Sequence, residues 1–227
     1  MGTDDLFKKR RSKLQERAKE TRIPKPNSFL IVSEGEKTEP NYFDGLAHYI
    51  DEKYGRGPDV EKPIITACGR GRCTVALVEE AARIVARATI RYSQVWVVFD
   101  KDNFDDFDDA IALANKYGYR SAWSNESFEY WIYLHFSYSD SALGRDDWVK
   151  KLDRIFREYG IDENGYKKNN PNIFKIATTH GSLKSAVGSA IRIYKSYPPN
   201  AKPSLCNPCT QVHNLILELK PYLEELL

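Results

Sequence analysis

Short apolar runs alternate with helix-like segments through the first half of the chain. Four segments have the length and composition of buried strands: 29–32, 64–67, 95–99 and 119–123. Each of the first three predicted strands is followed by a segment in which apolar residues have helical spacing. These segments begin at Thr38, begin at Thr74 and span 110–117, respectively. Thr38 is placed to cap its helix, with Pro40 in the first turn. Strands alternating with helices predict an α/β fold with a mostly parallel sheet covered by helices on both faces.

The second half of the chain has mainly helical periodicity. Apolar spacing predicts helices over 128–136, 146–158, 183–194 and 210–226, the last interrupted by Pro221. We therefore expect three parts: a basic N-terminal arm (1–27), an α/β domain (28–136), and a mainly helical C-terminal region (137–227) that completes or extends the domain.

Composition and charge narrow the class of protein. A hydrophobic content of 41% is enough for a core. The first 26 residues carry nine Lys/Arg and four Asp/Glu, so this arm is +5 while the remainder is −3. No apolar segment approaches a signal sequence or a membrane span, which predicts a soluble cytoplasmic protein. The four cysteines are then expected to be reduced thiols, and only Cys206 and Cys209 have a spacing typical of zinc ligands.

Acidic residues follow two of the predicted strands directly. Glu34 comes after the first strand, and Asp100 and Asp102 come after the strand at 95–99. Because ligands gather at the carboxyl ends of strands in open α/β sheets, these three carboxylates are expected to meet. Carboxylate oxygens bind Mg²⁺ or Mn²⁺, and such an ion can activate water and stabilise a leaving oxygen in phosphodiester cleavage. Lys37, beside the acids, is a candidate for stabilising the transition-state phosphate.

Other interpretations of these acids remain open. Acids at strand ends often only cap the next helix or face solvent. The segment Val97-Val98-Phe99-Asp100-x-Asp102 also imitates the nucleophile strand of HAD-type phosphatases, although that reading leaves Glu34 unexplained. The acids at 105, 106, 108 and 109 are expected to complement a helix dipole and face solvent. His135 is expected to be a hydrogen-bonded core histidine.

Several motifs in order along the chain resemble the RloB-like family. They are Ile31 to Phe43 (IVSEGEKTEPNYF), Val98 to Asp102 (VFDKD), Ser124 to Trp131 (SNESFEYW), Leu134 to Phe136 (LHF) and Asn207 to Thr210 (NPCT). The resemblance implies a Toprim-like domain and a bacterial anti-phage defence nuclease. Two departures are Glu126-Ser127, where the family is expected to have Pro-Cys, and Cys209, where it is expected to have Ser.

The resemblance also implies roles for individual acids. The Toprim glutamate falls on Glu34, and the Asp-x-Asp pair that binds magnesium falls on Asp100 and Asp102. Glu39 sits where the related OLD-type nucleases carry a second acid, with a spacing one residue longer, and Glu36 competes for this role. Glu129 matches a Phe-Glu-x-Trp element of the family, and in apolar surroundings it needs a metal or a lysine as partner.

Basic residues provide candidate contacts to nucleic acid. The arm (Lys8, Lys9, Arg10, Arg11) can neutralise phosphates without reading bases. Arg70 and Arg72, in a Gly-Arg-Gly-Arg turn between a strand and a helix, can seat a phosphate, and a simple turn is the alternative. His180 and Lys184 can contact phosphate, or His180-Gly181-Ser182 can be a loop and helix cap.

These patterns together favour a Mg²⁺- or Mn²⁺-dependent nuclease that cleaves DNA or RNA, tRNA included. The alternative from a different class is a non-catalytic nucleic-acid-binding or sensor component that works with a partner protein of a defence complex.

Overall fold

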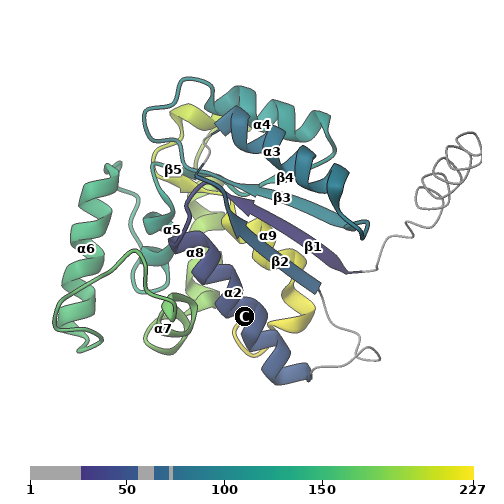
Figure 1. Cartoon of the computed structure of the whole chain (residues 1–227). Coiled ribbons are helices and arrows are strands. Elements are labelled where there is room, and N and C mark those ends of the chain that lie inside the picture. The colour runs from purple at the N-terminus through teal and green to yellow at the C-terminus, as the bar shows by residue number, and fades with distance from the viewer. Residues whose placement is uncertain (1–26, 56–63, 72–73) are drawn as a thin grey trace, which may run out of the picture.

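The computed structural model describes residues 27–55, 64–71 and 74–227. A four-stranded parallel sheet lies at its centre, with strand order β2-β1-β3-β4 (Figure 1). The strands are β1 (Ser28–Ser33), β2 (Ile64–Gly69), β3 (Gln94–Val98) and β4 (Arg120–Ser121). Their parallel pairing confirms the α/β class predicted from alternating strands and helices.

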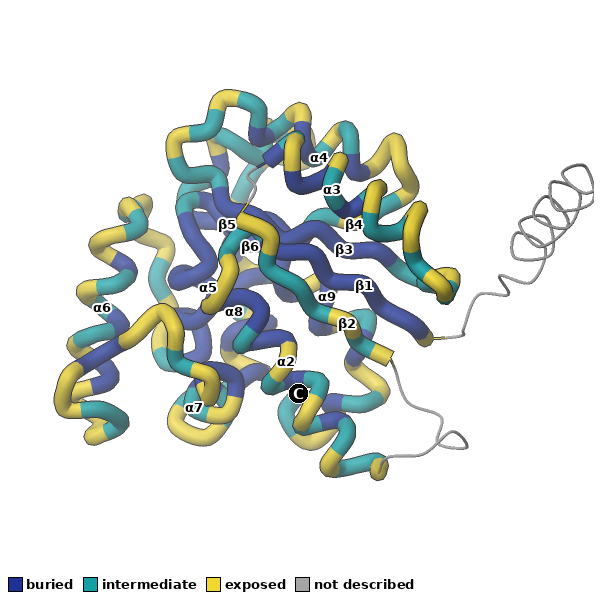
Figure 2. The backbone as a smooth tube through the Cα atoms, in the orientation of Figure 1, coloured by how far each residue is buried: buried dark blue, intermediate teal, exposed yellow. Residues whose placement is uncertain are grey.

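The alternating side chains of β1 belong to two separate cores. Phe29 and Ile31 pack in one hydrophobic cluster, and Leu30 and Val32 pack in the other. Because successive side chains of a strand point to opposite faces, the sheet is buried on both sides. The two central strands accordingly lie among the most buried parts of the molecule in Figure 2.

Different helices cover the two faces. Helices α3 (Thr74–Arg87) and α4 (Phe107–Lys116) pack against the face with Leu30 and Val32. Helix α2 (Thr38–Tyr54) and the C-terminal helices cover the other face. These are α5 (Phe128–Leu134), α6 (Arg145–Glu158), α7 (Ile173–Thr179), α8 (Leu183–Tyr194) and α9 (Val212–Glu218).

The C-terminal region is mainly helical, as predicted, and is joined to the sheet by a second, two-stranded sheet. Strand β5 (Ser124–Asn125) pairs antiparallel with β6 (Cys209–Thr210). The predicted helix at 210–226 is shorter than expected. Helix α9 ends at Glu218, and Pro221 lies in a 3-10 turn, Lys220–Tyr222, because proline lacks the amide hydrogen that a continuing helix needs. A further 3-10 turn spans Pro203–Leu205.

Two local predictions need correction. Thr38 does not cap α2: Lys37 occupies the N-cap position, and the Thr38 hydroxyl donates to the Lys168 carbonyl at 2.7 Å. The expected strand at 119–123 is reduced to Arg120–Ser121, but the chain beyond it still follows β3. The amides of Ala122 and Ser124 donate to carbonyls of Val97 and Phe99, which leads the chain toward β5.

The acids at 105–109 are only partly solvent-facing. Asp106 accepts hydrogen bonds from the Thr74 hydroxyl at 2.6 Å and the Val75 amide at 3.4 Å, at the start of α3. Asp108 accepts from the Ser204 amide and hydroxyl. Asp105 and Asp109 are exposed, as predicted. Two of these carboxylates therefore tie α4 to other segments.

Among the described residues, no helix is both long enough and apolar enough to cross a bilayer. The thiols of Cys68, Cys206 and Cys209 are free.

Candidate active site

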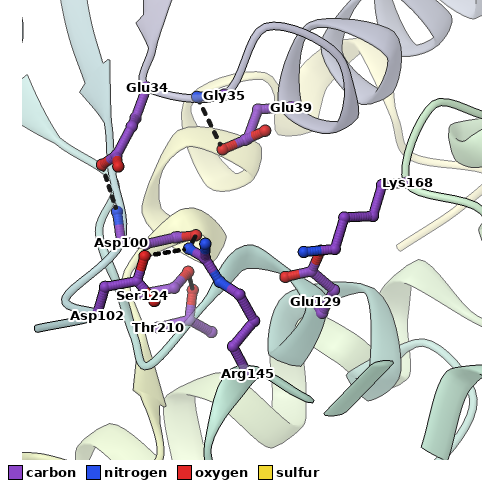
Figure 3. A network of polar contacts seen from close by, with 10 residues as sticks. All are labelled: Glu34, Gly35, Glu39, Asp100, Asp102, Ser124, Glu129, Arg145, Lys168 and Thr210. Atoms are coloured by element: carbon purple, nitrogen blue, oxygen red, sulfur yellow. Dashed lines mark hydrogen bonds and ion pairs between the residues drawn. The ribbon is translucent and has the colours of Figure 1, made fainter. Parts of the chain in front are cut away.

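The acids predicted at the strand ends meet at the carboxyl edge of the sheet. The register pairs Ser33 of β1 with Val98 of β3, so the residues that follow these strands emerge side by side. The Glu34 amide donates to the Val98 carbonyl at 2.9 Å, and the Asp100 amide faces Glu34 Oε2 at 3.4 Å (Figure 3). Two residues that are 66 positions apart in sequence are thereby brought into direct contact.

Arg145 joins the two aspartates. Its Nη2 lies 2.8 Å from Asp100 Oδ2 and 2.6 Å from Asp102 Oδ2. The arginine is the first residue of α6, and it has no motif around it that indicates a role. Its position follows from the structure alone, where the buried Asp100 carboxylate needs a cation or a proton.

Glu39 faces the same site from the first turn of α2. Its Oε1 accepts a hydrogen bond from the Gly35 amide at 3.2 Å, and its side chain is buried. A Cβ at position 35 would collide with the Glu39 carboxylate, which explains a glycine between Glu34 and Glu36. Glu36 is exposed, so Glu39 is the better buried of the two competing acids.

Glu129 reaches the site from α5 and has a lysine partner. Lys168 Nζ lies 3.4 Å from Glu129 Oε1, and the carboxylate is buried. A lysine is one of the two partners expected for this acid in its apolar surroundings. The hydrogen bond from Thr38 to the Lys168 carbonyl also holds the loop that carries this lysine.

Burial makes this group of acids resist ionisation. Burial is the main cause that raises the pKa of Glu34 to about 7, and the charges of Asp102 and Glu39 add to it. Burial and then the Glu39 and Glu129 charges raise the pKa of Asp100 well above its usual value, against the opposing effect of Arg145. Burial also raises the pKa of Glu39 and of Asp102. Without a bound cation, these buried acids therefore favour their protonated forms.

A pocket of about 290 Å³ lies among these acids and is called the carboxylate pocket below. It is lined by Glu34, Gly35, Glu36, Lys37, Thr38, Glu39, Asp100, Phe128, Glu129, Arg145 and Lys168. Asp102 lies beside it and is connected through Arg145. All but one of the acids proposed as metal ligands thus line one pocket, and Lys37 lines it too.

The donor chemistry of the carboxylate pocket fits a hard divalent cation. Its acids supply only oxygen atoms, and Asp100 Oδ1 is buried without a hydrogen-bond partner in the described part of the chain. No three acidic, His or Cys groups of residues 27–55, 64–71 and 74–227 are gathered closely enough to form a complete metal site. Arg145 instead provides the positive charge beside Asp100 and Asp102.

The other predicted contact residues lie outside this pocket. Arg70 is exposed in the turn after β2, whose amides at 70 and 71 donate to the carbonyls of Ser33 and Glu34. His180 and Lys184 are exposed near the start of α8, where Ser182 accepts from the Ser185 amide and forms the predicted helix cap. Arg72 and the arm residues Lys8, Lys9, Arg10 and Arg11 lie outside the described residues.

His135 is a core residue, as predicted. Its Nε2 lies 3.0 Å from the Tyr42 hydroxyl, and its Nδ1 lies 3.1 Å from the Trp131 carbonyl. Burial lowers its pKa to about 4, so it is neutral at pH 7. A neutral, fully enclosed imidazole supports α5 against α2 and does not reach the carboxylate pocket.

A model of the RloB-like protein family matches residues 29–219. The chain belongs to the RloB-like family. No curated protein and no solved structure matches it. The RloB-like match includes every residue that lines the carboxylate pocket and leaves the basic arm outside. The family resemblance predicted from the motifs is therefore confirmed over most of the chain.

Proposed function

We propose that this RloB-like protein is a Mg²⁺- or Mn²⁺-dependent nuclease that cleaves phosphodiester bonds of DNA or RNA. The observation that supports this most directly is Asp100. Its carboxylate is buried just beyond the end of a central strand, one of its oxygens has no hydrogen-bond partner among the described residues, and it faces a pocket lined by four other acids. Protein interiors rarely hold such a concentration of negative charge unless a cation or a proton compensates it.

Glu34, Asp100 and Asp102 are the proposed ligands of the cation. Glu39 supports them from α2, with Glu36 as the competing residue, and Glu129 supports them from α5. A bound Mg²⁺ would supply Lewis acidity toward a phosphate oxygen and toward water.

Cationic side chains around the pocket have a separate role in this proposal. Lys37 and Lys168 line it together with Arg145. They are placed to bind the phosphate of a substrate and to stabilise the charge that develops on it. The basic arm (1–27) would add sequence-independent contacts to the nucleic-acid backbone.

Membership of the RloB-like family supports a place in bacterial anti-phage defence, in the cytoplasm and with a possible partner protein.

One observation favours a second candidate, a non-catalytic nucleic-acid-binding or sensor component. Arg145 already pairs with both Asp100 and Asp102, and the described residues assemble no complete cation site. In this alternative the arginine is a permanent structural partner of the aspartates, and the basic residues alone determine affinity for nucleic acid.

Incubation of the purified full chain with supercoiled DNA, single-stranded DNA and total tRNA tests the proposal. Each substrate is incubated with Mg²⁺, Mn²⁺ or EDTA. The test variant is Asp100→Ala with Asp102→Ala, and the matched control is Asp105→Ala with Asp109→Ala, which removes two exposed acids nearby. Circular dichroism establishes that both variants fold.

Metal-dependent cleavage by the wild type and the control, lost in the test variant, supports the nuclease and identifies its substrate class. Cleavage that persists in the test variant contradicts the assigned site. Nucleic-acid binding without cleavage, unchanged in the test variant and in the presence of candidate partner proteins, favours the sensor.

A further inference from the structure

A second pocket lies at the β4 edge of the four-stranded sheet. It has a volume of about 610 Å³, more than twice that of the carboxylate pocket, and shares no lining residue with it. Its walls come from β4, α4, the end of α8 and α9, and we call it the edge pocket. A pocket of this size accommodates a small organic ligand.

Aromatic rings form one part of the edge pocket. Trp123 lines it from the segment after β4, and Tyr194 and Tyr197 line it from the end of α8 and the loop beyond. The Tyr197 hydroxyl donates to the Pro208 carbonyl at 3.3 Å, which fixes that ring as a wall. Tyr194 is 48% exposed, so its ring is available to stack on a planar ligand.

Side-chain amides form another part. Asn115, Gln211 and Asn214 all line the pocket. Gln211 is only 6% exposed, and its Nε2 is buried without an oxygen or nitrogen acceptor among the described residues. This amide lies against the Cys209 thiol, which is a weak acceptor. Gln211 Oε1 accepts from Asn214 Nδ2, so the two amides together form a polar wall of the pocket.

Positive charge borders the same pocket. Arg120 lies over the buried Trp96 ring, with its guanidinium carbon 5.4 Å from the ring centroid, and pairs with Glu218. Arg120 lines the pocket and is 52% exposed, so its guanidinium is accessible to an anionic group of a ligand.

We propose that the edge pocket binds the nucleobase of a nucleotide. Stacking on the exposed Tyr194 ring suits a planar heteroaromatic ring, and asparagine and glutamine amides suit the mixed donors and acceptors of a base edge. The half-exposed Arg120 suits the attached phosphate. The base can come from a free nucleotide or from an unpaired position in a nucleic-acid strand, because both present the same chemistry.

Direct binding measurements test this inference without any need for turnover. Tryptophan fluorescence and calorimetry, in EDTA, follow titration of the full chain with the four ribonucleoside monophosphates and with short single-stranded oligonucleotides. The test variant is Tyr194→Ala, and Asn214→Ala is a second variant at an exposed amide. The matched control is Tyr159→Ala, since Tyr159 is 51% exposed and lines neither pocket.

We expect saturable binding that Tyr194→Ala weakens about tenfold, the loss of one base-stacking contact, while Tyr159→Ala has no effect. Asn214→Ala should change the order of preference among the bases. Binding of mononucleotides identifies a free nucleotide as a sufficient ligand, and binding of oligonucleotides alone identifies a strand. No binding at about 1 mM of any probe, or equal affinity in the Tyr194 and Tyr159 variants, overturns the inference.

Because EDTA prevents metal-dependent cleavage, these outcomes are independent of the nuclease proposal. An inactive protein can still bind bases here, and an active nuclease can fail to do so.

Discussion

Each of the two pockets contains an arginine paired with carboxylate, but the two pairs lie in different surroundings. In the carboxylate pocket, the Asp100 side chain is only 7% exposed and Arg145 is 33% exposed. In the edge pocket, Arg120 is 52% exposed and Glu218 is 33% exposed. The same chemical pair is therefore largely removed from water in one place and solvated in the other.

Burial changes what these pairs do to the acids. Burial raises the pKa of Asp100 well above its usual value even though Arg145 opposes this. Burial also acts on Glu218, but hydrogen bonds from Gln94 and Arg120 outweigh it and lower the pKa. The first site thus holds charge at a cost in stability, as expected where a metal or substrate is to be bound. In the second site, these hydrogen bonds stabilise the ionised carboxylate of Glu218.

Removal of Arg145 should produce the largest difference between the two pockets. Arg145→Ala leaves Asp100 buried without its cation, and we expect the free energy of unfolding at pH 7 to fall by about 2–3 kcal/mol. This is less than for a fully buried pair because Arg145 is partly exposed. Urea unfolding measures it. The loss should shrink near pH 5, where a proton can replace the arginine.

The control for this variant is Arg154→Ala on the same helix. Arg154 pairs with Glu158 at 3.7 Å on an exposed surface, and its removal should cost at most about 0.5 kcal/mol. Equal losses in the two variants would show that Arg145 supports only the helix. Added Mg²⁺ should recover stability in Arg145→Ala if the aspartates accept a cation in its place.

The pH dependence of stability should be governed by Glu34. Its pKa is raised to about 7 in the folded chain and returns to about 4.5 on unfolding. The folded state therefore binds more protons between these values, so stability falls as pH rises from about 4.5 to 7. Glu34 is partly solvated, and we expect a change of about 1–2 kcal/mol from this residue.

Glu34→Gln should remove this part of the change in unfolding free energy with pH. Glu36→Gln, at an exposed neighbour, should leave it in place. Urea unfolding at several pH values measures both. A slope that is the same in Glu34→Gln and the wild type would show that other groups in the pocket, with Asp100 foremost, determine it.

The sequence anticipated the carboxylate pocket better than the edge pocket, for a physical reason. Glu34, Asp100 and Asp102 each follow a buried strand directly, so a parallel sheet brings them to one edge whatever the loops do. The family resemblance also indicated that Glu39 and Glu129 belong to this site. Arg145 was missed because a helix packing on α5 delivers it, and no local pattern records that contact.

No sequence motif marks the edge pocket as a pocket. Its residues come from β3, β4, α4, the end of α8 and α9, and only tertiary packing brings these segments together. Helix α7 and strand β6 were unpredicted for a similar reason: they are short, and partners elsewhere in the fold stabilise them. The strands and long helices were predictable because their own periodicity determines which face is buried.

The smallest effect is expected at the edge pocket's own ion pair. Arg120→Gln removes an exposed contact to Glu218 and the stacking over Trp96, so the free energy of unfolding should fall by about 1 kcal/mol. Because the pair is solvated, the loss should be smaller at high salt, whereas the loss in Arg145→Ala should depend little on salt. Urea unfolding of both variants at low and high NaCl makes this comparison. An Arg120→Gln loss that exceeds the Arg145→Ala loss, or that does not respond to salt, would show that burial is not what separates the two pockets.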